Sequence, residues 1–195
     1  MMAHVNYLDI LAIGNLERAE DGSVKEANST STLIRSGNRL IVVDPSSRMM
    51  RPAIKLSFRQ IGVFMKDVDT VVLTHPHHDH MENLDLFPNA EVLVHSGGEA
   101  SPDHTVVEGD RRISEGVELV HTPGHTWDSM SVFVKGDLNY AVVGDAIPLE
   151  DNFRKKVPPR FNIGEDTAMK SIKTIANFAD VIVPGHGAPF RIRKR

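Results

Sequence analysis

The residues from His75 to His80 read His-Pro-His-His-Asp-His and lie one residue beyond the apolar run 71–73. Imidazole and carboxylate side chains together suit zinc and other divalent transition ions. So many candidate ligands in one short segment indicate a metal site at the end of a buried strand. The fold of the remaining chain must either complete that site or leave it incomplete.

Three further apolar runs, 117–120, 140–143 and 181–183, are each followed within a few residues by a side chain of the same kind: His125, Asp145 and His186. If all these strands end at one edge of the fold, the side chains converge there. Loops at such an edge commonly carry the functional residues of a rigid scaffold. One four-coordinate ion does not need all of these ligands. Two ions about 3.5–4 Å apart would use them, with a carboxylate bridging and water completing the open positions.

This series resembles the metallo-β-lactamase-fold metallohydrolases, which carry His-X-His-X-Asp-His, then a lone His, a lone Asp and a last His, each after a strand. The resemblance runs from Thr74 to His186. It implies an α/β fold, a four-layered αββα sandwich with the metal site at one edge of the two sheets. It also implies that Asp44, which follows the strand-like run 40–43, orients a ligand imidazole.

The resemblance further implies a division of the ligands. The first ion would be held by His75, His77 and His125, and the second by Asp79, His80 and His186, with Asp145 bridging the two. We expect two divalent ions, zinc in the first place, with iron or manganese as alternatives. The diiron flavoprotein branch has Glu at the position of His77, which argues against that redox branch. The chain also ends soon after His186, so we do not carry over the substrates of members with an added helical domain.

The remaining pattern favours one domain over residues 1–195, with strands in series and a few helices. Hydrophobic spacing predicts a helix over about 52–65, a short helix over 82–87 and a last helix from Asp166 or Thr167 to Phe178. The strand-like segments 28–35 and 40–43 read as a hairpin. The polar segment 15–27 reads as a loop or a hairpin tip.

Composition excludes several classes of function. The net charge of −4 gives no general case for binding nucleic acid, and the absence of cysteine excludes disulfides and thiolate ligands. No apolar run approaches the roughly 20 residues of a membrane span, and the first residues do not resemble a secretory signal. We therefore expect a cytoplasmic protein without a membrane partner, and the sequence leaves its oligomeric state open.

The leading functional hypothesis is a metal-dependent hydrolase that acts on an ester-like bond, such as a thioester or lactone, of a small molecule. Asp79 is the candidate catalytic residue, because a carboxylate among the ligands can orient the attacking water or take its proton. Two enzymatic alternatives use the same site: a phosphodiesterase or nuclease, and an iron-dependent dioxygenase of sulfur compounds. A metal-binding domain without activity is the non-enzymatic alternative.

Several residues near the motifs are open to two interpretations. The basic segment Arg154–Arg160 either steers an anionic substrate or forms a solvated loop, and the basic tail Arg191–Arg195 either contacts nucleic acid or is a solvated terminus. We expect that His78 and His121 do not bind metal: His78 occupies a variable position of the motif, and His121 has a structural or exposed role. Trp127 either walls a substrate pocket or packs in the core, and the hydroxyls of Thr126 and Ser129 either support the metal ligands or stabilise a turn.

Overall fold

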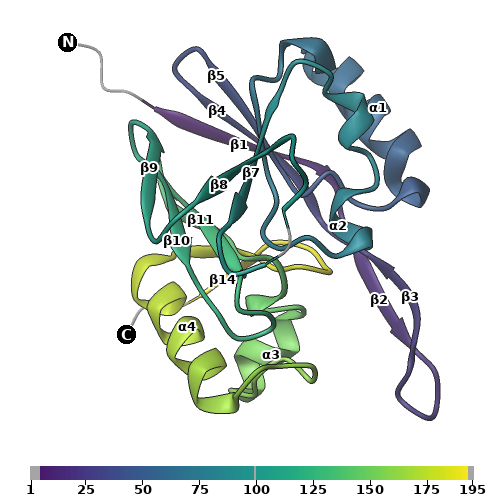
Figure 1. Cartoon of the computed structure of the whole chain (residues 1–195), viewed down its shortest axis with the longest axis vertical. Helices are drawn as coiled ribbons and strands as arrows, with labels where there is room; N and C mark the ends of the chain where they lie inside the picture. Colours follow the sequence, from purple (N-terminus) through teal and green to yellow (C-terminus); the bar gives the residue numbers. More distant parts are fainter. Residues whose placement is uncertain (1–4, 99, 193–195) are drawn as a thin grey trace.

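The computed structural model describes residues 5–98 and 100–192, and two six-stranded sheets dominate it (Figure 1). The first sheet has the order β1-β4-β5-β6-β7-β8. Its strands are β1 Asn6–Ala12, β4 Ser31–Ser36, β5 Arg39–Val43, β6 Thr70–Val72, β7 Glu91–His95 and β8 His104–Val107. The second sheet has the order β14-β13-β12-β11-β10-β9. Its strands are β9 Arg111–Ser114, β10 Val117–His121, β11 Met130–Lys135, β12 Asn139–Val142, β13 Val181–Val183 and β14 Phe190–Arg191.

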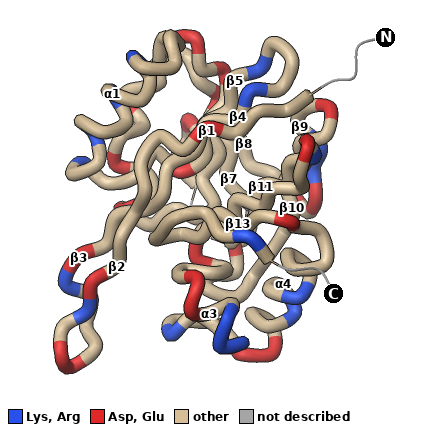
Figure 2. Tube along the Cα trace, turned by 180° about the vertical axis from the view of Figure 1, so that it is seen from behind, with Lys and Arg blue, Asp and Glu red and all other residues tan. Residues whose placement is uncertain are grey.

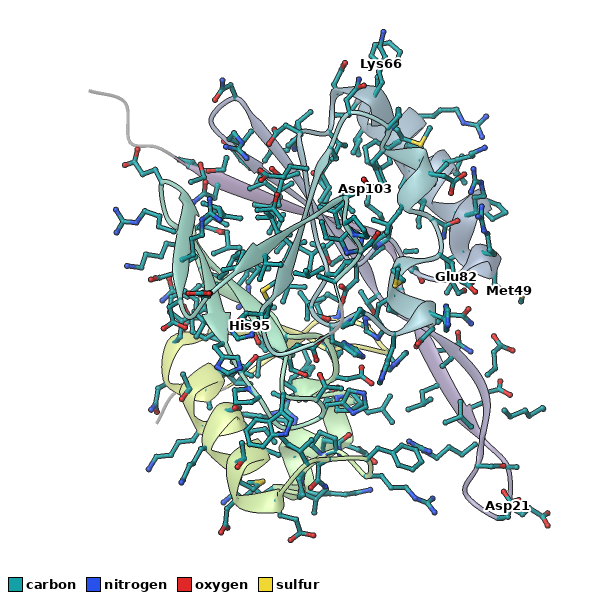
Figure 3. The ribbon with its side chains drawn as sticks, viewed as in Figure 1. Asp21, Met49, Lys66, Glu82, His95 and Asp103 are labelled. Atoms are coloured by element: carbon teal, nitrogen blue, oxygen red, sulfur yellow. The ribbon has the colours of Figure 1, made fainter. Side chains whose placement is uncertain are left out.

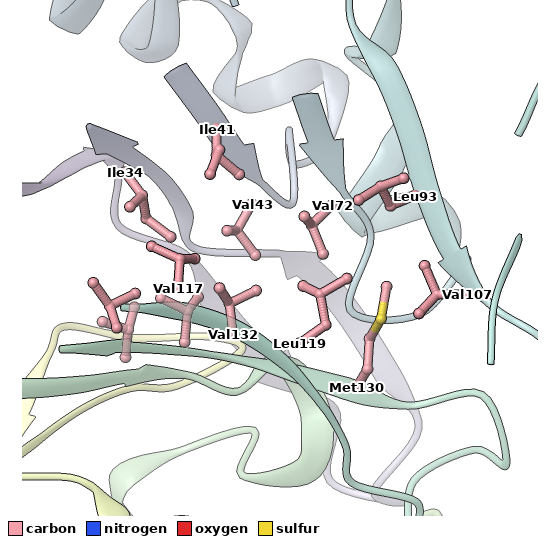
Figure 4. Close-up of a cluster of buried hydrophobic side chains, with 13 residues drawn as sticks. Ile34, Ile41, Val43, Val72, Leu93, Val107, Val117, Leu119, Met130 and Val132 are labelled. Atoms are coloured by element: carbon pink, nitrogen blue, oxygen red, sulfur yellow. The ribbon is translucent and has the colours of Figure 1, made fainter. Parts of the chain in front are cut away.

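The two sheets pack face to face through an apolar core. Side chains of a strand alternate between its two faces, so Ile41 and Val43 of β5 point into the core between the sheets while Val42 points outward. Leu119 and Val132 reach the same core from the second sheet (Figure 4). Each fully buried aliphatic side chain of this kind stabilises the fold by about 1.5–3 kcal/mol.

Helices cover the outer face of each sheet. The helices are α1 Arg51–Ile61, α2 His78–Met81, α3 Glu150–Lys155 and α4 Glu165–Phe178, with short 3-10 turns η1 Arg48–Met50, η2 Met65–Asp67, η3 Leu84–Leu86 and η4 Gly144–Ala146. Ile54 and Phe58 of α1 are buried against Val42 and its neighbours, while Ile172 and Ile175 of α4 pack against the outer face of the second sheet. The expected four-layered αββα sandwich is therefore confirmed (Figure 1).

Strand direction brings the ends of several strands to one edge. β5, β6 and β7 run parallel, so Asp44 and the segment that starts at His75 emerge at the same edge of the first sheet. β12 and β13 are also parallel, and β10 and β12 are both antiparallel to β11 between them. The segments that follow β10, β12 and β13 therefore leave the second sheet on one side, which is the arrangement a shared site needs.

Two predicted helices differ from the structure, and the segment 15–27 takes one of its two predicted forms. The helix expected over 52–65 ends at Ile61, because Gly62 takes the left-handed conformation at φ 69° and Met65 belongs to the separate turn η2. The helix expected over 82–87 is replaced by α2 and η3, which lie on either side of Glu82 and Asn83. The polar segment 15–27 forms the hairpin of β2 Asn15–Arg18 and β3 Val24–Asn28, which stands apart from both sheets (Figure 1).

Among the described residues, none of the helices is both long enough and apolar enough to cross a membrane.

Candidate metal centre

The loops at this edge bring all of the sequence-predicted ligands together. Their side-chain nitrogen and oxygen atoms form three overlapping groups in which the atoms lie within 4.8 Å of one another. The members of these groups are His75, His77, Asp79, His80, His125, Asp145 and His186. Residues more than 100 positions apart in sequence thus share one cluster, because each follows a strand that ends at the same edge of the sandwich.

The first group consists of three imidazoles, on His75, His77 and His125. Nε2 of His75 lies 2.9 Å from Nδ1 of His77, and Nε2 of His125 lies 3.1 Å from that same Nδ1. Three nitrogens bound to one tetrahedral zinc at about 2.0–2.1 Å are roughly 3.3 Å apart. The observed spacing is therefore close to that of a three-histidine metal site.

The second group combines imidazoles with carboxylates. Oδ2 of Asp79 lies 3.7 Å from Nε2 of His80 and 3.6 Å from Nε2 of His186. Asp145 lies between the two groups, since its Oδ1 is 3.1 Å from Nε2 of His186 while its Oδ2 is 3.7 Å from Nε2 of His125. One carboxylate thus presents an oxygen to each group, the arrangement expected of a bridging ligand.

Contacts on the outer side of the cluster orient the rings. Nδ1 of His80 donates to Oδ2 of Asp44 over 2.8 Å, and Asp44 also accepts from the backbone and hydroxyl of Thr74. Nδ1 of His186 donates to the carbonyl of Asn28, at 2.9 Å. Because Nδ1 carries the proton in each ring, Nε2 keeps a free lone pair directed into the cluster. The expected role of Asp44 beside a candidate ligand imidazole is confirmed.

Two buried atoms in the cluster indicate whether the site suits a cation. Nε2 of His80 and Oδ1 of Asp145 are both shielded from solvent, and neither has a hydrogen-bond partner among the described residues. Leaving a buried polar atom unpaired costs about 1–3 kcal/mol, and more for a charged group. A divalent cation would satisfy both atoms at once, so the residues present fit a metal ion.

The electrostatics of the two groups differ. Burial lowers the pKa of His75 well below its usual value, and the nearby His80 lowers it further. Burial acts in the same direction on His80, but the carboxylates of Asp44 and Asp145 outweigh it and hold the pKa of His80 well above its usual value. Without a metal, His75 therefore favours the neutral imidazole, whereas His80 favours a bound proton.

A close backbone approach shapes the second group. Gly185 precedes His186, and a Cβ atom at this position would lie 2.1 Å from Oδ1 of Asp145. Any larger residue would therefore push the carboxylate away from the cluster. The glycine in the Pro-Gly-His sequence after β13 allows the carboxylate and the imidazole to meet.

The residues with two open interpretations lie outside the cluster. His78 is exposed, and His121 stacks on His95 with the ring centres 3.9 Å apart. The hydroxyls of Thr126 and Ser129 bond to each other over 2.8 Å, which is turn bonding. Trp127 is 60% exposed, so it neither packs in the core nor lines the cavity described below. The basic tail extends beyond the described residues, which end at residue 192.

A cavity of about 270 Å³ opens over the cluster. Ligand cavities of small-molecule sites start near this size. Its lining is apolar apart from the candidate ligands and two arginines. It comes from the β2–β3 hairpin, from Pro148 before α3 and from the loop after α3: Leu16, Arg18, Val24, Ala27, Pro148, Pro159, Arg160 and Phe161. The sequence predicted a loop or a hairpin tip at residues 15–27 but assigned these residues no part in the site.

Comparison with known proteins agrees with this geometry. A sequence profile described as the metallo-β-lactamase superfamily matches residues 24–99. A protein of Methanocaldococcus jannaschii named as a probable metallo-hydrolase is 36% identical over 167 residues, which cover 86% of this chain and 80% of that protein. The metallo-β-lactamase domain-containing protein 1 of Xenopus laevis is 35% identical, over 89% of this chain and 76% of that one.

The chain belongs to the metallo-β-lactamase superfamily. Solved structures share its fold at lower identity. A candidate metallo-β-lactamase from Thermotoga maritima superposes with a TM-score of 0.80 over 97% of this chain and 100% of that one, at 20% identity. A quorum-quenching N-acyl homoserine lactone hydrolase gives a TM-score of 0.74 over 95% and 93%, at 19% identity. The protein is thus a metallo-β-lactamase-like hydrolase of a metal-dependent family.

Proposed function

We propose that the protein hydrolyses an ester-like bond of a small molecule, a lactone or thioester first of all, with two divalent ions held by the clustered side chains. Zinc is the ion we propose, since three imidazoles in the first group suit it. His75, His77 and His125 would hold one ion, and Asp79, His80 and His186 the other. Asp145 would bridge them.

One observation carries this proposal: side-chain nitrogen and oxygen atoms from distant loops converge within 4.8 Å of one another in three overlapping groups. Nε2 of His80 and Oδ1 of Asp145 are buried there without a hydrogen-bond partner among the described residues. A structural zinc site needs only four ligands and keeps no open position. The larger donor set, together with a cavity above it, favours a catalytic centre.

When bound, divalent ions lower the pKa of a coordinated water towards about 7 and polarise the bond to be cleaved. Asp79 is half-buried and lines the cavity, so its carboxylate can orient the attacking water and accept its proton. The apolar walls exclude competing water from the substrate. Support for a lactone also comes from the fold likeness to a lactone hydrolase.

The test is a metal titration coupled to a substrate panel. Chelator-treated protein receives zinc, manganese or iron, its metal content is measured by elemental analysis, and turnover of a lactone, a thioester, a carboxylic ester and a phosphodiester is recorded. We expect hydrolysis of lactone or thioester that rises with metal content. Turnover confined to the phosphodiester would favour the nuclease alternative, and no turnover of any substrate by the fully loaded protein would overturn the proposal.

A further inference from the structure

Two arginines in the lining of the cavity approach the same glycine. Nη1 of Arg18 donates to the carbonyl of Gly22 over 3.2 Å. Arg160 reaches the same glycine from the opposite segment, since a Cβ atom on Gly22 would lie 2.0 Å from its Nη1. Both arginines line the cavity that contains the candidate ligands Asp79 and His125. Two positively charged residues therefore line the same cavity as the candidate metal ligands.

The hairpin presents Arg18 to the cavity by strand geometry. Leu16 pairs with Ala27 and Arg18 pairs with Val24, and these four residues form the face that lines the cavity. The guanidinium of Arg18 also lies over the ring of Phe161, 5.3 Å from its centre. Stacking on an aromatic ring holds a guanidinium in a defined position. Arg18 is thus oriented before any ligand arrives.

No ion pair joins Arg18 or Arg160 to a carboxylate in the part of the chain that the structure describes. Asp21, at the tip of the hairpin (Figure 3), interacts with Arg160 through its charge, but its Oδ1 accepts from the backbone and hydroxyl of Ser23. Most of the N–H donors of both guanidinium groups therefore remain available to a ligand.

Arg154 and Lys155 of the same basic segment differ from Arg160 because they form ion pairs. Arg154 pairs with Glu150 at 2.8 Å and Lys155 pairs with Asp151 at 2.6 Å, both along α3. Figure 2 shows these acidic and basic residues side by side on α3. Of the basic residues in the segment Arg154–Arg160, only Arg160 lines the cavity. Its charge is therefore directed to the site, whereas the charges on α3 are balanced locally.

We infer that Arg18 and Arg160 form a carboxylate-binding subsite, so that the preferred substrate is a small ester-like molecule with a carboxylate at the end away from the scissile bond. The planar guanidinium fork matches a carboxylate by paired hydrogen bonds. The apolar residues between the arginines and the metal ligands would contact a short aliphatic chain that joins the two groups. This inference rests on the proposed function, because the cleaved bond must lie at the metal centre.

The experiment compares two esters of equal length, mono-4-nitrophenyl adipate, which carries a carboxylate, and 4-nitrophenyl hexanoate, which is neutral. The measured quantity is the ratio of their kcat/KM values for metal-loaded protein. A charge-assisted hydrogen bond contributes about 1.5–3 kcal/mol, which corresponds to roughly 10-fold or more. We expect Arg18→Ala and Arg160→Ala each to lower the ratio by about 10-fold, mainly through KM for the adipate ester.

Matched controls remove a positive charge elsewhere. Lys25 lies on the same hairpin but outside the cavity lining and pairs with Glu17, and Arg154 lies on α3. Lys25→Ala and Arg154→Ala should leave the ratio unchanged. Arg160→Lys should restore part of the preference because it keeps the charge. A ratio that stays the same in Arg18→Ala and Arg160→Ala, or falls equally in the controls, would overturn the inference.

A binding measurement separates this inference from the proposed function. If the wild-type protein hydrolyses neither ester, the proposed function fails for such esters, and calorimetric titration with adipic acid monoanilide then tests the subsite alone. Binding to the wild type about 10-fold tighter than to the Arg18→Ala/Arg160→Ala variant would support the subsite. Equal binding to both would overturn it. Circular dichroism and metal content of each variant verify that it is folded.

Discussion

The two halves of the candidate metal centre differ in charge. His75, His77 and His125 form an all-imidazole group, whereas Asp79, His80 and His186 share their half with the carboxylates of Asp44 and Asp145. Burial lowers the pKa of His75 and His77, while the carboxylates raise the pKa of His80 and His186 against the effect of burial. The comparison teaches that His75 and His77 offer neutral nitrogen donors, whereas His80 and His186 attract a cation, a proton included.

The largest expected effect is the loss of an imidazole from the first half. His77→Ala removes the nitrogen that lies within 3.1 Å of both other imidazoles, so we expect hydrolysis to fall to background and the metal content to drop by half. Elemental analysis would measure the metal content, and a turnover assay would measure the hydrolysis. The matched control is His78→Ala in the adjacent exposed residue, which should keep metal and activity. Full metal content in His77→Ala would contradict the division into two groups.

A smaller loss is expected from the carboxylate behind the second half. Asp44→Asn keeps the shape of the side chain but removes the charge that orients His80. Loss of such an outer partner typically costs about 10–100-fold in metal affinity or activity. Competition with a chromophoric chelator would measure the affinity of each half. We expect the weakening to be confined to one ion of the pair, and an equal loss at both would contradict the comparison.

Proton binding by the second half gives an opposite pH dependence in the two forms of the protein. The pKa values of His80 and His186 lie above the unfolded value of about 6.5, so above that pH the folded metal-free protein binds more protons than the unfolded chain. Its stability should therefore fall as the pH rises from about 6.5, by at most about 1.4 kcal/mol per pH unit for each imidazole.

Metal-loaded protein should show the reverse trend, because protons compete with the metal for the same nitrogens. Urea denaturation at several pH values above about 6.5, with chelator or with zinc, would measure both slopes. Stability of the metal-free protein that rises with pH over this range would show that the carboxylates do not dominate the second half.

The smallest effect concerns the residue that connects the halves. The hydroxyl of Thr74 donates to Asp44 over 2.7 Å and lies 3.2 Å from Nδ1 of His75, so it contacts the supports of both groups. Thr74→Val removes the hydroxyl that donates to the buried carboxylate of Asp44 and lies beside Nδ1 of His75, and it should cost about 1–3 kcal/mol of stability. Denaturant unfolding would measure this. A matched Thr126→Val variant, whose hydroxyl bonds only within its turn, should cost less.

Local sequence patterns were sufficient for the strands that carry the ligands. The apolar runs before His75, His125 and His186 form β6, β10 and β13, since short runs rich in β-branched residues fit the pleated, buried surface of a sheet. Helix ends were less predictable. The spacing that includes Met65 continues beyond α1, but Gly62 stops the helix, and propensity cannot weigh a stop signal against a continuing apolar pattern.

The sequence by itself determined the kind of site, because ligand type and order are local properties of the chain. Only the tertiary structure decided which atoms face each other: that the two oxygens of Asp145 point to different halves, and that Arg18 and Arg160 meet at one glycine. These contacts depend on how distant segments pack. A hairpin without apolar alternation on both strands carries no sequence signal of the surface that it will cover, so its part in the cavity is visible only in the folded protein.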